Sequence, residues 1–133
     1  MTTPDPAALL HLAAEAAEHS YSPYSGFRVG AAVVTADGTV VMGANIENAA
    51  YGASVCAETN AITSAVAQGH RGIDAVAVVC LDGDLCTPCG NCRQVMREFG
   101  VRTVVLRDED GAPRSVPLAD LLPESFGPEA LDR

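Results

Sequence analysis

The sequence predicts an α/β fold in which helices cover a central β-sheet. Two observations lead to this prediction: segments with helical periodicity alternate with short apolar segments, and strong turn signals separate them. Hydrophobic residues make up 48% of the 133 residues, which is enough for one core. This length fits a single domain spanning residues 1–133.

The first half of the chain is predicted to contain a helix, a hairpin and a second helix. Asp5 and Pro6 suit the N-cap and the first helical position, and Ser22-Pro23 ends that helix. Asp37-Gly38 is a strong signal for the turn of a hairpin. The expected elements are a helix at 6–19, strands at 29–35 and 39–46, and a helix at 54–68.

The second half is predicted to continue with alternating strands and helices. Residues 75–80 form an apolar run between two aspartates, which suits a strand buried on both faces. Pro88 and Gly100 bracket the next helical segment, and Asp110-Gly111 indicates a turn. The expected elements are a strand at 75–80, a helix at 89–99, strands at 102–106 and 114–116, and at most one helical turn at 119–122.

The charge of the chain argues against two classes of partner. Eight basic and seventeen acidic residues give a net charge of −9, so a phosphate backbone or an anionic membrane is a poor partner. The N-terminus lacks the features of a signal peptide, and the longest apolar run, residues 75–81, is far shorter than the roughly 20 residues of a membrane helix. We therefore expect a cytoplasmic protein without nucleic-acid or membrane partners.

Three of the five cysteines have the spacing of a metal site. Cys89 and Cys92 are three residues apart at the start of a predicted helix, and Cys56 lies at the start of another. Helix N-termini lower the pKa of thiols and favour the thiolates that bind metal. Three thiolates around Zn²⁺ leave a fourth tetrahedral position open, as in catalytic zinc sites. Glu58, two residues after Cys56, can face such a site as a general acid and base.

Cys86 leaves three other interpretations open. It could be the fourth thiolate of a closed structural zinc site, although this leaves Glu58 without a role. An iron–sulfur cluster fails because Met96 occupies the position of the fourth cysteine. A redox pair of Cys86 with Cys89 leaves the other cysteines unused. The simplest interpretation is that Cys86 is a loop thiol and Cys80 a small core residue.

The segments around the metal-site cysteines resemble the zinc-dependent nucleoside and nucleobase deaminases. Residues 56–58 have the sequence Cys-Ala-Glu, and Pro-Cys-Gly-Asn-Cys follows at 88–92, which together match the three-cysteine form of that signature. The similarity to the short, three-cysteine cytidine deaminases is closer and covers nearly the whole chain. The additional similar segments are residues 21–25, 27–32, 45–48, 51–52, 89–94, 121–123 and 126–127.

The resemblance implies a specific fold, assembly and metal site. The fold would be a three-layer α/β/α arrangement with a five-stranded mixed sheet, and the assembly a homotetramer with active sites near the subunit interfaces. Cys56, Cys89 and Cys92 would hold one Zn²⁺ per chain, and Glu58 would shuttle protons.

The resemblance also implies residues that bind a pyrimidine nucleoside. Asn45 and Glu47 match residues that bond the ribose 3′-hydroxyl, and Phe27 matches the aromatic side chain that packs on the pyrimidine. The backbone of Ala57 would hold the base carbonyl. Tyr51 and Phe126 match residues near a neighbouring subunit's site. Taken singly, Asn45 and Glu47 could instead cap the end of the hairpin, and the two phenylalanines could simply be packing residues.

One position departs from the pattern of the similar family. Relatives often carry arginine directly after the glutamate, where it hydrogen-bonds the thiolate ligands, whereas this chain has Thr59. A hydroxyl can replace that charge with a hydrogen bond, which would alter the electronic properties of the metal. Arg93, which directly follows Cys92, is a family feature that this chain retains.

The leading hypothesis is hydrolytic deamination of cytidine and 2′-deoxycytidine to the uridines, with release of ammonia, in pyrimidine salvage. A zinc-bound hydroxide would attack C4 of the base while Glu58 moves the protons. One alternative is deamination of a modified cytosine nucleoside of the blasticidin type, which the carboxylate of Glu47 disfavours. Others are an editing deaminase, which the charge disfavours, and a non-catalytic zinc module, which would require a closed site.

Overall fold

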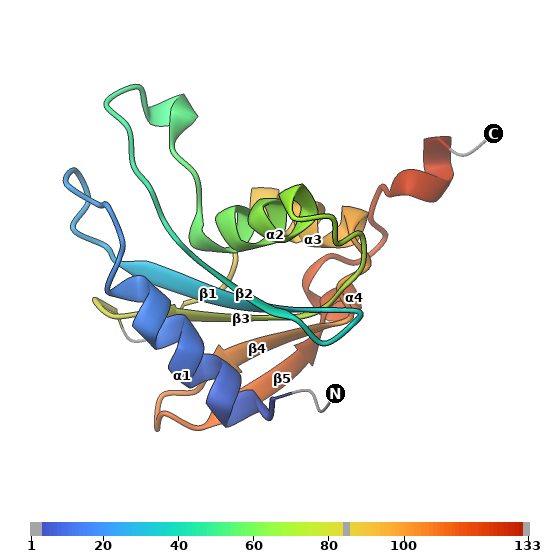
Figure 1. The fold of residues 1–133 in the computed structure, drawn as a ribbon, viewed down its shortest axis with the longest axis horizontal. Helices are drawn as coiled ribbons and strands as arrows, with labels where there is room; N and C mark the ends of the chain where they lie inside the picture. Colours follow the sequence, from blue (N-terminus) through green and yellow to red (C-terminus); the bar gives the residue numbers. More distant parts are fainter. Residues whose placement is uncertain (1–3, 84–85, 132–133) are drawn as a thin grey trace.

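The computed structural model describes residues 4–83 and 86–131, and its centre is a five-stranded sheet (Figure 1). The strand order is β2-β1-β3-β4-β5. Strands β3 and β4 are parallel, whereas the other neighbouring pairs are antiparallel, so the sheet is mixed as the family resemblance implied. The strands are β1 (Val29–Thr35), β2 (Val40–Ala44), β3 (Ile73–Cys80), β4 (Thr103–Arg107) and β5 (Pro113–Pro117).

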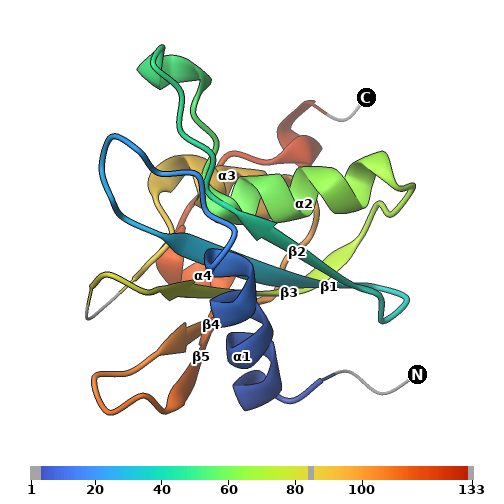
Figure 2. The ribbon, with the colours of Figure 1, turned by 60° about the vertical axis from the view of Figure 1, so that its left-hand side comes forward.

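Helices cover both faces of this sheet, which confirms the three-layer arrangement (Figures 1 and 2). Helix α1 packs on one face, and α2 and α3 lie together on the other. No helix in the described part of the chain has the length and apolar character needed to cross a membrane. The helical elements are α1 (Pro6–Ala17), α2 (Ala57–Ala67), α3 (Gly90–Glu98), α4 (Leu118–Leu121) and the short 3-10 turns η1 (Tyr51–Ala53) and η2 (Pro128–Leu131).

Strand β1 divides the core into two layers. Ala31 and Val33 face the layer beneath α2 and α3, whereas Ala32 and Val34 face α1, as the two-residue period of a strand requires. All four side chains are fully buried. Gly30 lets α1 approach the sheet closely, since a Cβ there would lie 2.0 Å from the carbonyl oxygen of a residue in α1.

The largest departure from the expected elements concerns the start of α2. The sequence predicted a helix from residue 54, but α2 begins at Ala57 with Cys56 as its N-cap. The chain stays extended up to this point because Val55 and Ile46 exchange two backbone hydrogen bonds of 2.9 and 3.0 Å. This pairing fixes Cys56 at the helix start. The other strand and helix boundaries differ from the expected ones by about two residues, which is ordinary.

Candidate metal centre and active site

The N-termini of α2 and α3 bring three cysteine thiols together. Cys56 is the N-cap of α2, Cys89 is the N-cap of α3, and Cys92 lies in the first turn of α3. The two helices lie side by side on the same face of the sheet (Figure 2). All three sulfur atoms lie within 4.8 Å of one another, and the Sγ atoms of Cys56 and Cys89 are 3.8 Å apart. The predicted cluster is therefore formed.

The spacing of these sulfur atoms fits a tetrahedral zinc ion. Two thiolates bound to Zn²⁺ at about 2.3 Å with tetrahedral angles lie about 3.8 Å apart, which equals the distance between the sulfurs of Cys56 and Cys89. Among the described His, Cys, Asp and Glu residues, Cys56, Cys89 and Cys92 form the group that is close enough to share one ion. Cys86 is described but is not part of this group, which argues against a closed four-thiolate site.

The surroundings of Cys86 also argue against a redox pair. Its side chain is half-buried and packs against the core beneath α2 and α3. Burial raises the pKa of the Cys86 thiol to about 12, so the reactive thiolate is scarce at neutral pH. Cys80 is a buried core residue at the end of β3, as expected.

The metal-site thiols differ in their acidity. Burial raises the pKa of the Cys56 thiol and that of the Cys92 thiol. At Cys89 burial also acts to raise the pKa, but the backbone N–H of Cys92 and the neighbouring thiols outweigh it, so the net shift is downward. The lowering of the thiol pKa expected at helix N-termini prevails at Cys89, whereas burial outweighs the opposing effects at Cys56 and Cys92. Metal coordination would deprotonate all three thiols.

Glu58 lies in the first turn of α2, two residues after Cys56 of the thiol cluster. Its side chain is only 4% exposed, and the described part of the chain gives it no ion-pair partner. Burial raises the pKa of its carboxyl group, partly offset by a backbone N–H. A carboxyl group with a raised pKa exchanges protons more readily near neutral pH, which is the property of a general acid and base.

Thr59 and Arg93 contact the metal-site segments in different ways. The hydroxyl of Thr59 lies 3.3 Å from Sγ of Cys92, so it reaches a thiol as predicted. The guanidinium of Arg93 instead donates to two backbone carbonyls, those of Pro88 and Leu121, each at 2.7 Å. Arg93 therefore fixes the residue that precedes Cys89 and ties α3 to α4.

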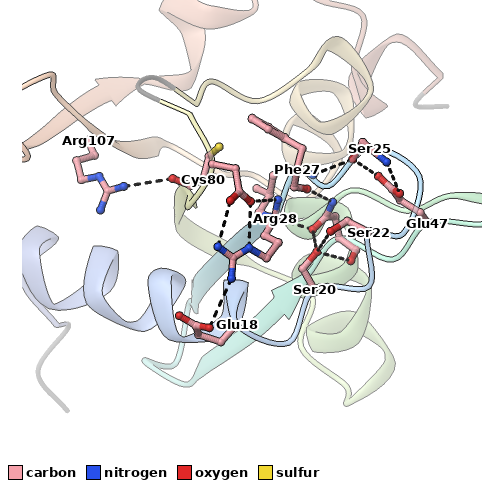
Figure 3. A network of polar contacts seen from close by, with 12 residues as sticks. Glu18, Ser20, Ser22, Ser25, Phe27, Arg28, Glu47, Cys80 and Arg107 are labelled. Carbon is pink, nitrogen blue, oxygen red and sulfur yellow. Dashed lines mark hydrogen bonds and ion pairs between the residues drawn. The ribbon is translucent and has the colours of Figure 1, made fainter.

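Asn45 and Glu47, at the end of β2, are held by two serines of the segment that joins α1 to β1. Asn45 Oδ1 accepts hydrogen bonds from Ser20 Oγ at 2.5 Å and from a backbone N–H of β1 at 2.9 Å. Glu47 accepts from Ser25 Oγ and from the backbone N–H groups of Tyr24 and Ser25 at 2.9 and 3.1 Å. Figure 3 shows these contacts around Ser20, Ser25 and Glu47.

Backbone pairing joins this segment to the thiol cluster. Tyr21 pairs with Ile46, which pairs in turn with Val55, the residue before Cys56. The backbone N–H of Glu47 donates to the carbonyl of Tyr21 at 2.8 Å. Asn45 and Glu47 therefore flank a residue that is hydrogen-bonded directly to the chain entering the metal site.

Ala57, Phe27 and Tyr51 adjoin this region, whereas Phe126 lies beside α3, and the exposure of these residues varies. The backbone N–H of Ala57 is one of the amides that the start of α2 leaves unbonded within the helix. Phe27 is 38% exposed, and its carbonyl accepts a hydrogen bond from Asn45 Nδ2 at 2.8 Å. Tyr51, in a loop that projects beyond α2 (Figure 1), is 75% exposed, and its ring packs edge-on against Tyr24. Phe126 is 60% exposed, and Gln94 of α3 holds its carbonyl.

Sequence reasoning missed the serines that hold Asn45 and Glu47. Ser20 and Ser25 lie between α1 and β1, and no sequence pattern assigned a role to either of them. Their partners are 25 and 22 residues away, so nothing in the local sequence indicates the pairing. The available signal was the family-like segment at 21–25, which contains Ser25.

Comparison with known proteins identifies the family. Residues 4–107 match the family model of the cytidine and deoxycytidylate deaminase zinc-binding region. A cytidine deaminase from Halalkalibacterium halodurans is 42% identical over 93% of this chain and 96% of its own length. One from Mycobacterium tuberculosis is 42% identical over 91% of this chain and 89% of its own. The crystal structure of a cytidine deaminase from Burkholderia pseudomallei is 48% identical, with a TM-score of 0.82 and coverage of 90% of this chain and 97% of that chain. The chain therefore belongs to the cytidine and deoxycytidylate deaminase zinc-binding family.

Proposed function

We propose that this protein deaminates cytidine and 2′-deoxycytidine hydrolytically, giving uridine and 2′-deoxyuridine with release of ammonia. The observation that carries the proposal is the group of three thiols from two helix starts, with a buried glutamate in the first turn of α2 beside Cys56. The names of the relatives support this substrate class. Residues 1–133 would act as one catalytic domain, with a role in pyrimidine salvage.

Cys56, Cys89 and Cys92 would hold one Zn²⁺ per chain, and their geometry suits it. When bound, the metal supplies a water nucleophile that is usable near neutral pH. Glu58 would accept a proton from that water and pass it to N3 of the base. It would then take the remaining proton of the hydroxyl group added at C4 and deliver it to the departing amine, so that ammonia leaves as the C4 carbonyl forms. Its burial supports this role, because a raised pKa lets the carboxyl group carry the proton between steps.

The residues after β2 would bind the ribose. After its bond to the Phe27 carbonyl, Asn45 Nδ2 retains one N–H that can donate to a hydroxyl. Glu47 accepts three hydrogen bonds and keeps one acceptor site, on Oε2, that can accept from the same 3′-hydroxyl. The ring of Phe27 would pack against the pyrimidine, and the backbone N–H of Ala57 would hold its carbonyl oxygen. A carboxylate that binds ribose favours an ordinary nucleoside over a modified one.

We also propose that the protein acts as a homotetramer. Four apolar side chains support self-association because they are largely exposed: Met42 at 48%, Ile46 at 41%, Tyr51 at 75% and Phe126 at 60%. Tyr51 and Phe126 would each approach the site of a neighbouring subunit. Light scattering on the purified protein would give four times the chain mass if this is correct, and the single-chain mass would contradict it.

Cytidine turnover tests the proposed reaction directly. The ultraviolet absorbance change that accompanies conversion to uridine should be rapid with metal-replete protein. Replacing Glu58 with Gln should leave zinc bound and reduce turnover by at least about 10²–10⁴-fold, the range for a general acid and base. Glu98→Gln is the matched control, because Glu98 is an exposed glutamate at the end of α3. Folded, zinc-loaded wild-type protein without turnover would reject the cytidine assignment.

A further inference from the structure

An ion pair outside the proposed substrate contacts joins the Phe27 segment to the end of β3. The guanidinium of Arg28 binds the carboxylate of Asp82 through two hydrogen bonds, Nε to Oδ2 at 3.0 Å and Nη2 to Oδ1 at 3.1 Å. The backbone N–H of Arg28 donates to the same carboxylate at 2.8 Å. The carbonyl of Arg28 also accepts from the N–H of Leu81 at 2.9 Å. We call the contacts between Arg28 and Asp82 the Arg28–Asp82 clamp.

The clamp is well formed for an ion pair near the surface. Two parallel N–H···O bonds give an arginine–carboxylate pair a defined orientation as well as attraction. Asp82 raises the pKa of Arg28, and Arg28 in turn lowers the pKa of Asp82, so both groups are charged at neutral pH. Figure 3 shows the guanidinium of Arg28 in this network, with Glu18 as a second and longer contact at 3.8 Å.

Gly83, directly after Asp82, lies against the ring of Phe27. A Cβ at Gly83 would be 3.1 Å from Cε1 and 3.6 Å from Cζ of that ring, and 3.3 Å from Sγ of Cys80. The backbone of Gly83 does not adopt the left-handed conformation that favours glycine. A larger residue here would therefore crowd the ring of Phe27 and Sγ of Cys80 rather than strain the backbone.

The hydrogen bonds of Phe27 involve its backbone and do not hold its ring. Its N–H donates to Ser25 Oγ at 3.0 Å, and its carbonyl accepts from Asn45 at 2.8 Å. The ring is 38% exposed, so the contact with Gly83 supports one side of it while the other side faces outward. The clamp fixes Gly83 in this place through the neighbouring Asp82.

We propose that Arg28 and Asp82 are positioning residues that hold Gly83 against Phe27 and so set the wall on which the pyrimidine packs. The inference rests on the proposed function, in which Phe27 contacts the base. Neither charged side chain needs to touch the substrate. Replacing either residue should change cytidine binding only when Phe27 is present. This distinguishes a positioning role from a direct contact with the substrate.

A double-mutant cycle tests this. Arg28→Met should raise the KM for cytidine about tenfold, within the range of coupling between residues in contact, and change kcat much less. In a Phe27→Ala background the same substitution should leave KM unchanged. Asp82→Asn should behave as Arg28→Met does. Arg114→Met is the matched control, because it breaks another exposed arginine–aspartate pair, with Asp108 in the turn between β4 and β5, and should leave KM at the wild-type value.

A second measurement is independent of cytidine. In wild-type protein, NMR should show a nuclear Overhauser effect between the ring protons of Phe27 and the α-protons of Gly83, and folded Arg28→Met should lose it. A wild-type protein that shows this contact but does not turn over cytidine would refute the proposed function and leave the clamp intact. An unchanged KM in folded Arg28→Met, or an equal rise in KM in the Phe27→Ala background, would overturn the positioning role.

Discussion

The contact between Thr59 and Cys92 leads to a prediction about zinc affinity. Thr59→Val removes one hydroxyl and nearly keeps the shape of the side chain, so it isolates the hydrogen bond to Sγ of Cys92 at 3.3 Å. A metal-bound thiolate carries no proton, so the hydroxyl must be the donor in the zinc-loaded protein. The substitution should therefore weaken zinc binding without removing a ligand.

The size of the effect can be worked out from the contact. A hydrogen bond to a charged group is worth about 1.5–3 kcal/mol, and about 1.4 kcal/mol corresponds to a tenfold change in affinity. Substitution of residues that bond metal ligands typically lowers metal affinity about 10–100-fold. Sulfur is a weak acceptor, which places the expected loss at the lower end, about tenfold in the zinc Kd.

Competition with a chromophoric zinc chelator measures this Kd, and the charge-transfer absorption of a Co²⁺-substituted protein reports whether three thiolates still bind. Thr59→Ser retains the hydroxyl and should bind zinc as tightly as wild-type protein. Thr63→Val is the matched control, because Thr63 lies one turn later on α2 and its hydroxyl donates to a backbone carbonyl at 2.7 Å. An unchanged zinc Kd in folded Thr59→Val would refute the argument.

Four further predictions concern other features. Gly30→Ala should destabilise the fold by about 1–3 kcal/mol or more in urea unfolding, because its Cβ would overlap the backbone of α1. Cys86→Ser should retain a full equivalent of zinc by elemental analysis, whereas loss of zinc would support a closed site. Ser25→Ala should raise the KM for cytidine more than it changes kcat, because Glu47 loses a hydroxyl donor. Hydrogen bonds from Thr35 and Thr39 lower the pKa of Asp37 from 3.8 to about 2, so this carboxylate stabilises the hairpin above about pH 4 and the contribution is lost as the pH falls toward 2. Thermal melts of Asp37→Asn should approach those of wild-type protein over that range.

The fold could be predicted largely because local signals agreed with the tertiary structure. Proline and glycine marked the ends of α3, and the Asp37-Gly38 signal gave the turn between β1 and β2. The sequence could not reveal that Val55 pairs with Ile46, because this contact depends on a bridge formed in the folded chain. That bridge delays the start of α2 by three residues relative to the prediction. Tertiary pairing overrode a helical pattern there.

The metal centre could be predicted from the sequence, whereas the contacts that hold Asn45 and Glu47 could not. Cys89 and Cys92 lie within one helical turn, so their sequence spacing alone places both thiols on one side of α3. Glu58 lies in the first turn of α2, whose N-cap is Cys56, so the start of this helix brings the carboxyl group near the thiols. The bonds of Ser20 to Asn45 and of Ser25 to Glu47 join separate segments, and no periodicity encodes them.

The metal centre and the region around Asn45 and Glu47 are joined where the backbones of Tyr21, Ile46 and Val55 pair. A displacement of the Ser20–Ser25 segment would move Asn45 and Glu47 through their side-chain bonds, and it would pull on Val55 through the backbone of Ile46. Cys56 follows Val55 directly. The residues proposed to bind the nucleoside and those proposed to bind the metal are thus linked across a few hydrogen bonds. Substitutions in the Ser20–Ser25 segment should consequently change KM more than kcat, because Cys56 is additionally held by its place at the start of α2.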